Sequence, residues 1–94
     1  MNATLLLAPS DLLRFGVTRE YVIENLDRYT KIENLEVPYA GHAGAEWLFD
    51  LTNNPSLQEE RERVYGRGRS ISVGDVVVIN GEKILCDSFG WVSL

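Results

Sequence analysis

The stretch SVGDVVVINGEKILCDSFGW, residues 72–91, contains the clearest fold signal in the chain. Asn80 and Gly81 stand between two apolar runs, and both residue types tolerate the positive φ angles of a two-residue type I′ turn. The stretch therefore predicts a β-hairpin in which Ile79 pairs with Glu82. The pairs that follow are Val78 with Lys83, Val77 with Ile84 and Val76 with Leu85.

Both faces of the predicted hairpin are apolar, so each needs cover from another part of the structure. One face holds Val77, Ile79, Ile84 and Cys86, and the other holds Val76, Val78 and Leu85 with Lys83 near the tip. We expect helices to cover one face and a further strand layer or a binding partner to cover the other. Gly90 permits a bulge or bend, after which residues 91–94 are expected to resume the strand.

Apolar periodicity predicts further elements before the hairpin. Residues 4–8 predict a first strand or apolar anchor, and Ser10 with Asp11 is a plausible helix start. Thr18 is the expected cap of a second helix, with Val17 and Val22 at the spacing of a hydrophobic staple. The buried face of this helix is expected to consist of Val22, Leu26 and Tyr29.

The middle of the chain predicts one more strand and one more helix. Residues 31–37 alternate in the manner of a weak strand, and residues 39–44 are expected to form a flexible loop of small residues. A helix is expected from about residue 45 to residue 52, where Asn53, Asn54 and Pro55 end it. Residues 56–69 are the most polar segment, and predict either a short solvated helix with a Glu59–Arg63 pair or a mobile loop.

Together these elements predict one α+β domain over residues 1–94: two or three helices packed on a small, mostly antiparallel sheet with a C-terminal β-hairpin. The chain has 94 residues and is 45% hydrophobic, which suits a single core. No apolar run approaches the roughly 20 residues that span a bilayer, so no membrane association is expected. Cys86 is the only cysteine, which excludes an internal disulfide and favours the cytoplasm.

Charge is unevenly distributed along the chain. The formal net charge is −5, and residues 1–60 carry ten acidic and four basic side chains. This acidity either keeps the domain soluble or supplies a contact surface for a partner. The candidate acidic face consists of Glu20, Glu24, Asp27, Glu33 and Glu36. A negative charge of this size opposes encounter with nucleic acid at long range, although a local basic site could still bind it.

Such a basic site is present around Tyr65, where arginines cluster with glycines. Its arginines are Arg61, Arg63, Arg67 and Arg69. Arginine forks bind carboxylates and phosphates, and Tyr65 could offer a stacking surface. Three interpretations stay open: a solvated loop whose arginines pair with neighbouring glutamates, a patch for carboxylates of a protein partner, or a nucleic-acid contact. The glutamates in question are Glu59, Glu60 and Glu62.

Little in the sequence predicts catalysis. His42 and Cys86 are the only residues of their kinds, which is too few for a typical zinc site. A cysteine–histidine nucleophile would need the two side chains in contact, and the apolar setting of Cys86 should raise its pKa. Asp75 and Asp87 flank the hairpin and are best explained by turn or strand-end hydrogen bonds. No metal, cofactor or catalytic residue is therefore predicted.

The second half of the chain combines several recognisable runs. Asn53, Asn54 and Pro55 follow a predicted helix, an arginine-containing connection leads to RSISVGDVV at residues 69–77, and DSFGW follows at residues 87–91. In this combination residues 45–94 resemble the YodL-like domain family. The resemblance implies an α+β unit from bacteria, phages or other mobile elements. That family has no established enzymatic activity, so it supplies no catalytic residues.

The leading hypothesis is a small non-catalytic protein-binding domain that regulates or inhibits host machinery. Its candidate partner-binding residues are Arg63, Tyr65, Arg67, Arg69 and Trp91. Trp91 lies near the chain end, where an open strand edge would invite pairing with another chain, including a second copy. The other aromatic candidates for core or interface are Trp47, Phe89 and Tyr39. One alternative is a nucleic-acid-associated module using residues 61–69, and another is a small cysteine-dependent enzyme.

Overall fold

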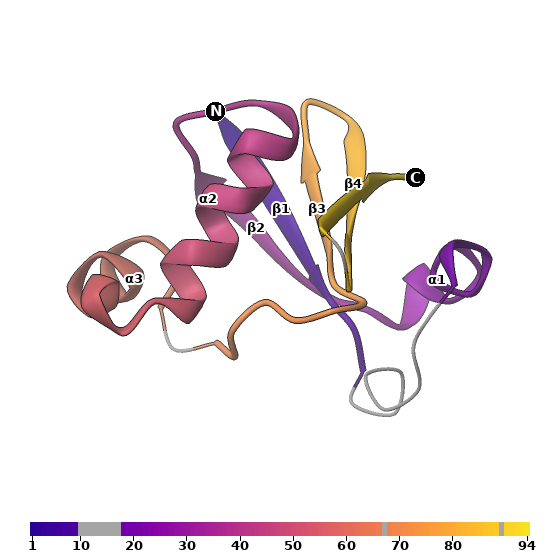
Figure 1. Ribbon diagram of the computed structural model, residues 1–94, viewed down its shortest axis with the longest axis horizontal. Coiled ribbons are helices and arrows are strands. Elements are labelled where there is room, and N and C mark those ends of the chain that lie inside the picture. Colours follow the sequence, from indigo (N-terminus) through magenta and orange to yellow (C-terminus); the bar gives the residue numbers. More distant parts are fainter. Residues whose placement is uncertain (10–17, 67, 89) are drawn as a thin grey trace.

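The computed structural model describes residues 1–9, 18–66, 68–88 and 90–94, and these ranges form a five-stranded antiparallel sheet with three α-helices (Figure 1). The strand order is β2-β1-β3-β4-β5. The strands are β1 (Asn2–Leu7), β2 (Thr30–Glu36), β3 (Val76–Ile79), β4 (Glu82–Asp87) and β5 (Gly90–Ser93). The predicted α+β fold class is confirmed. The hairpin supplies β3, the middle strand of the sheet.

The hairpin forms in the predicted register. Ile79 lies opposite Glu82, and the three pairs that follow along β3 and β4 are also as predicted. Asn80 and Gly81 have φ angles of 52° and 80°, as a type I′ turn requires. β1 then pairs with the free side of β3, and this places the N-terminal strand inside the sheet.

Helices cover both faces of the sheet. The helical elements are α1 (Arg19–Asn25), the short 3₁₀ helix η1 (Leu26–Arg28), α2 (Gly41–Asn53), the 3₁₀ helix η2 (Pro55–Leu57) and α3 (Gln58–Val64). Figure 1 shows α2 lying along the sheet, with α3 beyond one end of it and α1 at the opposite side of the molecule. The polar segment after residue 55 therefore contains a helix, one of the two structures predicted for it.

Two apolar clusters divide along the predicted faces of the hairpin. The larger joins Val77, Ile79, Ile84 and Cys86 to Leu48 and other residues of α2. The smaller joins Val76 and Leu85 to Val22 and Tyr29 around α1. The expectation of a further strand layer or a partner over the second face is wrong, because α1 and η1 supply that cover from within the chain.

The start of α1 follows the predicted capping pattern. The backbone N–H of Tyr21 donates to Thr18 Oγ1 at 3.2 Å, and Val22 is fully buried. The α-helix ends at Asn25 and tightens into η1, yet Leu26 and Tyr29 join Val22 in the same cluster. The predicted first helix around Ser10 and Asp11, and the staple residue Val17, lie outside the described residues.

Helix α2 begins earlier than predicted. Residues 41–44 were expected in a loop, but α2 starts at Gly41. Glycine is a poor helix former, so propensity misplaced this boundary. Gly44 is needed for packing, since a Cβ there would lie 2.2 Å from the carbonyl oxygen of Tyr39 and 2.7 Å from Ile79 Cδ1. The close approach of Gly44 to the Tyr39 carbonyl and to β3 therefore outweighs the low helix propensity of glycine.

The end of the chain also departs from the expectation. Residues 91–94 do not resume the β4 strand beyond Gly90. They instead turn back as β5, which runs antiparallel to β4 with Asp87 opposite Gly90. Gly90 has a φ angle of 132°, which other residues rarely adopt and which suits the reversal. Trp91 thereby comes to lie opposite Cys86 at the edge of the sheet.

Candidate functional site

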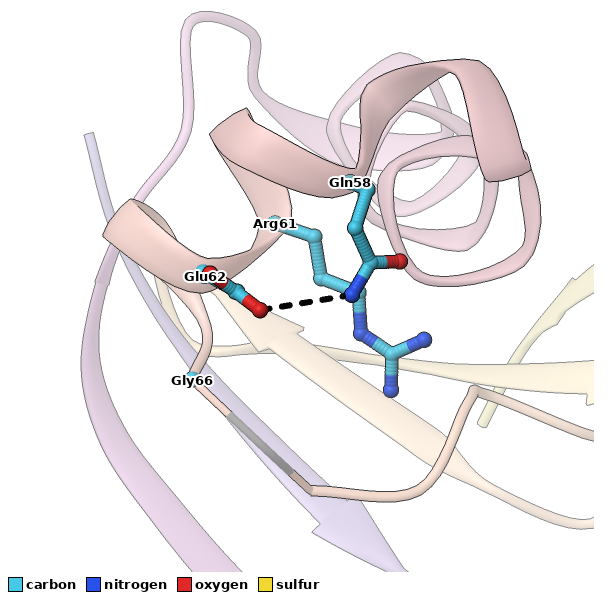
Figure 2. Close-up of a pocket in the computed structure, with 4 residues that line it drawn as sticks. All are labelled: Gln58, Arg61, Glu62 and Gly66. Carbon is cyan, nitrogen blue, oxygen red and sulfur yellow. Dashed lines mark hydrogen bonds between the residues drawn. The ribbon is translucent and has the colours of Figure 1, made fainter.

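Arg61 and Arg69 of the predicted arginine cluster form hydrogen bonds with other parts of the domain. Arg61 on α3 donates from Nη1 to the carbonyl of Thr52 at 2.9 Å and to Ser70 Oγ at 3.3 Å, and from Nη2 to the carbonyl of Gly68. Its guanidinium also lies 5.6 Å from the centre of the Tyr65 ring. Arg61 therefore ties the end of α2 and the segment after α3 together. Figure 2 shows its side chain extending away from α3.

Arg69 forms a two-pronged ion pair with Asp75. Nη1 lies 2.7 Å from Oδ2, and Nη2 lies 2.7 Å from Oδ1. Asp75 is 0% exposed and also accepts from the backbone N–H groups of Ala8 and Ser72, both at 2.8 Å. The hydrogen bonds that Arg69 donates to Asp75 raise the pKa of Arg69 and keep the guanidinium charged. This pair joins β1, the loop after α3 and the start of β3.

Tyr65 lies beneath the arginines rather than on the surface. Its side chain belongs to the larger apolar cluster, and the residue is 8% exposed. Its hydroxyl donates to the carbonyl of Arg69 at 2.5 Å, and burial raises its pKa. In this conformation the ring offers no free stacking face to a nucleic-acid base.

Among the described arginines of this segment, Arg63 extends into solvent. Its side chain is 75% exposed, and Nη2 lies 3.9 Å from Glu60 instead of pairing with Glu59. Such an exposed pair contributes about 0–1 kcal/mol. Beside it, Gln58, Arg61, Glu62 and Gly66 line a pocket of about 330 Å³, with the Gln58 amide 3.5 Å from Glu62 (Figure 2). Arg67 lies outside the described residues.

Trp91 stands apart from these arginines, on β5. Its indole Nε1 donates to Glu46 Oε2 at 2.7 Å, and its ring meets Phe49 edge-on with centroids 6.3 Å apart. On the same strand, Ser93 Oγ donates to Glu82 Oε2 at 2.8 Å and lies 3.1 Å from His42 Nε2. Thus three residues of α2 at positions i, i+4 and i+7 face the side chains of β5: His42, Glu46 and Phe49.

A pocket of about 200 Å³ opens where α2 meets the turn between β4 and β5. Its lining includes Glu46, Phe49, Cys86, Asp87 and Trp91. Burial raises the pKa of the Cys86 thiol to about 11, helped by the negative charges of Asp75, Glu46 and Asp87. The thiol is therefore neutral near pH 7, and His42 contacts Ser93 rather than Cys86. The structure does not bring together the cysteine–histidine pair that the enzyme alternative requires.

The two edges of the sheet differ in chemistry. The β2 edge carries Lys31, Glu33 and Glu36, and its pairing with β1 is interrupted by a register shift between Ala3 and Leu5. Charges and bulges of this kind protect an edge strand from pairing with another chain. The β5 edge has the sequence GWVS and carries no charged side chain.

The backbone of β5 is oriented for pairing on its open side. The backbone groups of Cys86 point toward the β3 side of β4. Its N–H donates to the backbone carbonyl of Asp75, and its carbonyl accepts from the N–H of Gly74, both at 2.8 Å. The backbone groups of successive residues in a strand point toward opposite neighbouring strands. Those of Leu85 therefore point toward Val92 on β5, and the N–H of Leu94 donates to the carbonyl of Lys83 at 2.8 Å. It follows that the N–H and C=O groups of Trp91 and Ser93 point away from β4.

Sequence reasoning selected Trp91 but missed its companions. From the sequence, His42 is a candidate only together with Cys86, and Glu46 is not a candidate. Their spacing with Phe49 along one helix face was a usable signal, but the early start of α2 was needed to place His42 on that face. The other aromatic candidates differ in burial. Trp47 packs against the larger cluster, whereas Tyr39 is 54% exposed. Phe89 lies outside the described residues.

Two further classes of site are absent from residues 1–9, 18–66, 68–88 and 90–94, which the structure describes. Among these residues, no group of three or more histidine, cysteine, aspartate or glutamate side chains is placed to hold a metal ion. No helix in the same part of the chain has the length and apolar character needed to cross a membrane.

Comparison of the chain with protein-family models, curated proteins and solved structures finds no significant match.

Proposed function

We propose that this chain is a small non-catalytic protein-binding domain that receives an extended segment of another protein at the β5 edge. The carrying observation is the orientation of Trp91 and Ser93, whose backbone groups point to the open side of an uncharged edge. In such strand addition, main-chain hydrogen bonds give affinity and neighbouring side-chain pockets give specificity.

The contrast with the other edge supports this choice. β2 has charged side chains and an irregular register, so it is a poor acceptor for a further strand. β5 is also backed by α2 through the contacts of Trp91 with Glu46 and Phe49. A strand held in this way is ordered before its partner arrives, which lowers the entropy cost of binding.

The resemblance of residues 45–94 to the YodL-like domain family supplies the proposed biological setting. On that basis the domain acts in the bacterial cytoplasm, from a bacterial, phage or mobile-element gene, as a regulator or inhibitor of host machinery. The exposed acidic side chains of α1, η1 and β2 are a secondary contact surface in this proposal. They include Glu20, Glu24, Asp27, Glu33 and Glu36.

The test is a substitution that blocks the edge without touching the core. Val92 is 38% exposed on β5, and Val73 is 37% exposed in the loop before β3. Val92→Lys places a charge on the edge, and Val73→Lys is the matched control. A partner captured from a bacterial host is purified, and its affinity for each variant is measured by calorimetry. We expect a loss of about tenfold or more for Val92→Lys only.

Hydrogen exchange on the purified complex supplies the second measurement. Strand addition should protect the backbone N–H groups of Trp91 and Ser93, which point outward in the free domain. Equal affinity of both variants, with no added protection at these two amides, would contradict the proposal. A dimer in light scattering that Val92→Lys abolishes would identify the partner as a second copy.

A further inference from the structure

The pocket beside β5 combines apolar walls with negative charge. Phe49 and Trp91 supply aromatic walls, and Glu46 and Asp87 supply two carboxylates. No basic side chain is among the described residues that line it. Glu46 accepts from the Trp91 indole at 2.7 Å, and Asp87 accepts from the backbone N–H of Ser88 at 2.7 Å. These neutral donors leave both negative charges in place.

The pKa of the Cys86 thiol in the pocket wall follows from burial and from these negative charges. The pKa of Cys86 is raised first by burial and then by Asp75, Glu46 and Asp87. Asp75 is paired with Arg69, whereas the lining residues Glu46 and Asp87 face the pocket itself. A field that disfavours a thiolate favours a cation in the same space.

We infer that this pocket binds a basic side chain, arginine or lysine, carried by the extended segment that pairs with β5. The aliphatic stem lies against the rings of Trp91 and Phe49, and the cationic head reaches Glu46 and Asp87. A pocket of about 200 Å³ suits one such side chain. Contact of the cation with the Trp91 ring adds to the attraction. This inference rests on the proposed function and adds the chemistry of the partner.

The sheet geometry specifies where the basic residue lies in the partner. The backbone groups of Trp91 point outward, so a partner strand that runs antiparallel to β5 places one residue directly opposite Trp91 across the new ladder. Residues paired across neighbouring strands have their side chains on the same face of the sheet. Trp91 projects on the face covered by α2, as its contacts with Glu46 and Phe49 show. The partner residue opposite Trp91 is therefore the one that enters the pocket.

Two capped pentapeptides provide the test. One is threonine–valine–arginine–valine–threonine, and the other carries citrulline, which has nearly the shape of arginine without its charge. Binding to the ¹⁵N-labelled protein is followed by NMR at the Trp91 indole signal and at the backbone amides of Trp91 and Ser93. We expect the arginine peptide to bind about tenfold more tightly than the citrulline peptide.

The double variant Glu46→Gln with Asp87→Asn should remove this difference between the peptides. Its matched control is Glu59→Gln with Glu60→Gln, which makes the same change in net charge at exposed positions of α3, away from the pocket. The control should keep the tenfold preference, apart from a uniform effect on both peptides. A preference that survives in the pocket variant would overturn the inference.

The outcomes separate the inference from the proposed function. Equal binding of the two peptides with shifts at both β5 amides would overturn the basic-residue inference and support strand addition. A shift of the indole signal with the arginine peptide alone, without shifts at the amides, would support the charged pocket and contradict strand addition. No shift with either peptide at millimolar concentration would overturn both.

Discussion

The indole nitrogen of Trp91 donates to Glu46 across 2.7 Å, although the two residues are 45 positions apart in the sequence. This hydrogen bond joins the edge strand β5 to helix α2. Together with the Phe49 ring and the His42–Ser93 contact, it holds β5 against the helix. The edge strand β5 is therefore supported by α2. The proposed binding depends on this support.

The coupling between Trp91 and Glu46 should be measurable in a double-mutant cycle. Trp91→Phe removes the donor but keeps a ring for Phe49, and Glu46→Ala removes the acceptor. A hydrogen bond to a carboxylate at a partly exposed site contributes about 1 kcal/mol, so we expect a coupling free energy of that order from urea unfolding. Strictly additive effects of the two substitutions would contradict this contact.

The Arg69–Asp75 pair should be the most sensitive polar contact in the domain. Asp75→Ala leaves a guanidinium and the N–H groups of Ala8 and Ser72 without their acceptor, so it should cost about 3–5 kcal/mol. Arg69→Lys keeps the charge but loses the two-pronged geometry, and its cost should be about 1–2 kcal/mol.

Arg63→Ala is the control for Asp75→Ala and Arg69→Lys, because Arg63 is exposed and only weakly paired. Its free energy of unfolding should change by no more than about 0.5 kcal/mol. Urea unfolding followed by circular dichroism measures all three variants. A cost for Arg69→Lys no larger than that for Arg63→Ala would argue against a structural role for Arg69.

Gly44 offers a test in which helix propensity and packing have opposite signs. Propensity alone predicts that Gly44→Ala stabilises α2 by about 1 kcal/mol. The added Cβ would instead collide with the Tyr39 carbonyl and with Ile79. We therefore expect a net loss of about 1–3 kcal/mol in thermal or urea unfolding. At the neighbouring exposed position, Ala43→Gly should cost about 1 kcal/mol through propensity alone.

Stability should fall at alkaline pH because of Cys86. Its thiol has a pKa of about 11 in the folded chain, against about 8.5 in an unfolded one. The unfolded chain therefore releases this proton first, so the stabilisation is complete below about pH 8.5 and is lost as pH rises toward 11. Urea midpoints between pH 7 and pH 10.5 measure the slope.

Cys86→Ser is the control for the alkaline effect, because serine does not titrate in this range. It should lower stability at every pH but flatten the decline above pH 8.5. Some slope should remain, because burial raises the pKa of Tyr29 to about 12. A wild-type midpoint that stays constant to pH 10.5 would contradict the burial of both groups.

Local chemistry made part of this structure predictable. The hairpin register follows from a two-residue turn, because Asn80 and Gly81 can adopt positive φ and each later pair is then counted from the turn. The Thr18 cap and the shared face of Val22, Leu26 and Tyr29 also follow from spacing within a few residues. The start of α2 does not follow from helix propensity, because Gly44 is explained by its close approach to the Tyr39 carbonyl and to Ile79 of β3.

Neighbouring residues suffice to specify the hairpin, the two apolar faces of β3 and β4, and the helix cap, because turn geometry and side-chain period act over short distances along the chain. Three other features appear only in the folded chain: Arg69 pairs with the buried Asp75, β5 turns back beside β4, and Glu46 contacts Trp91. Those contacts depend on which distant elements meet in space. Because Arg69 pairs with Asp75 inside the fold, this predicted partner-binding residue makes internal contacts instead. The β5 edge is then the candidate binding surface.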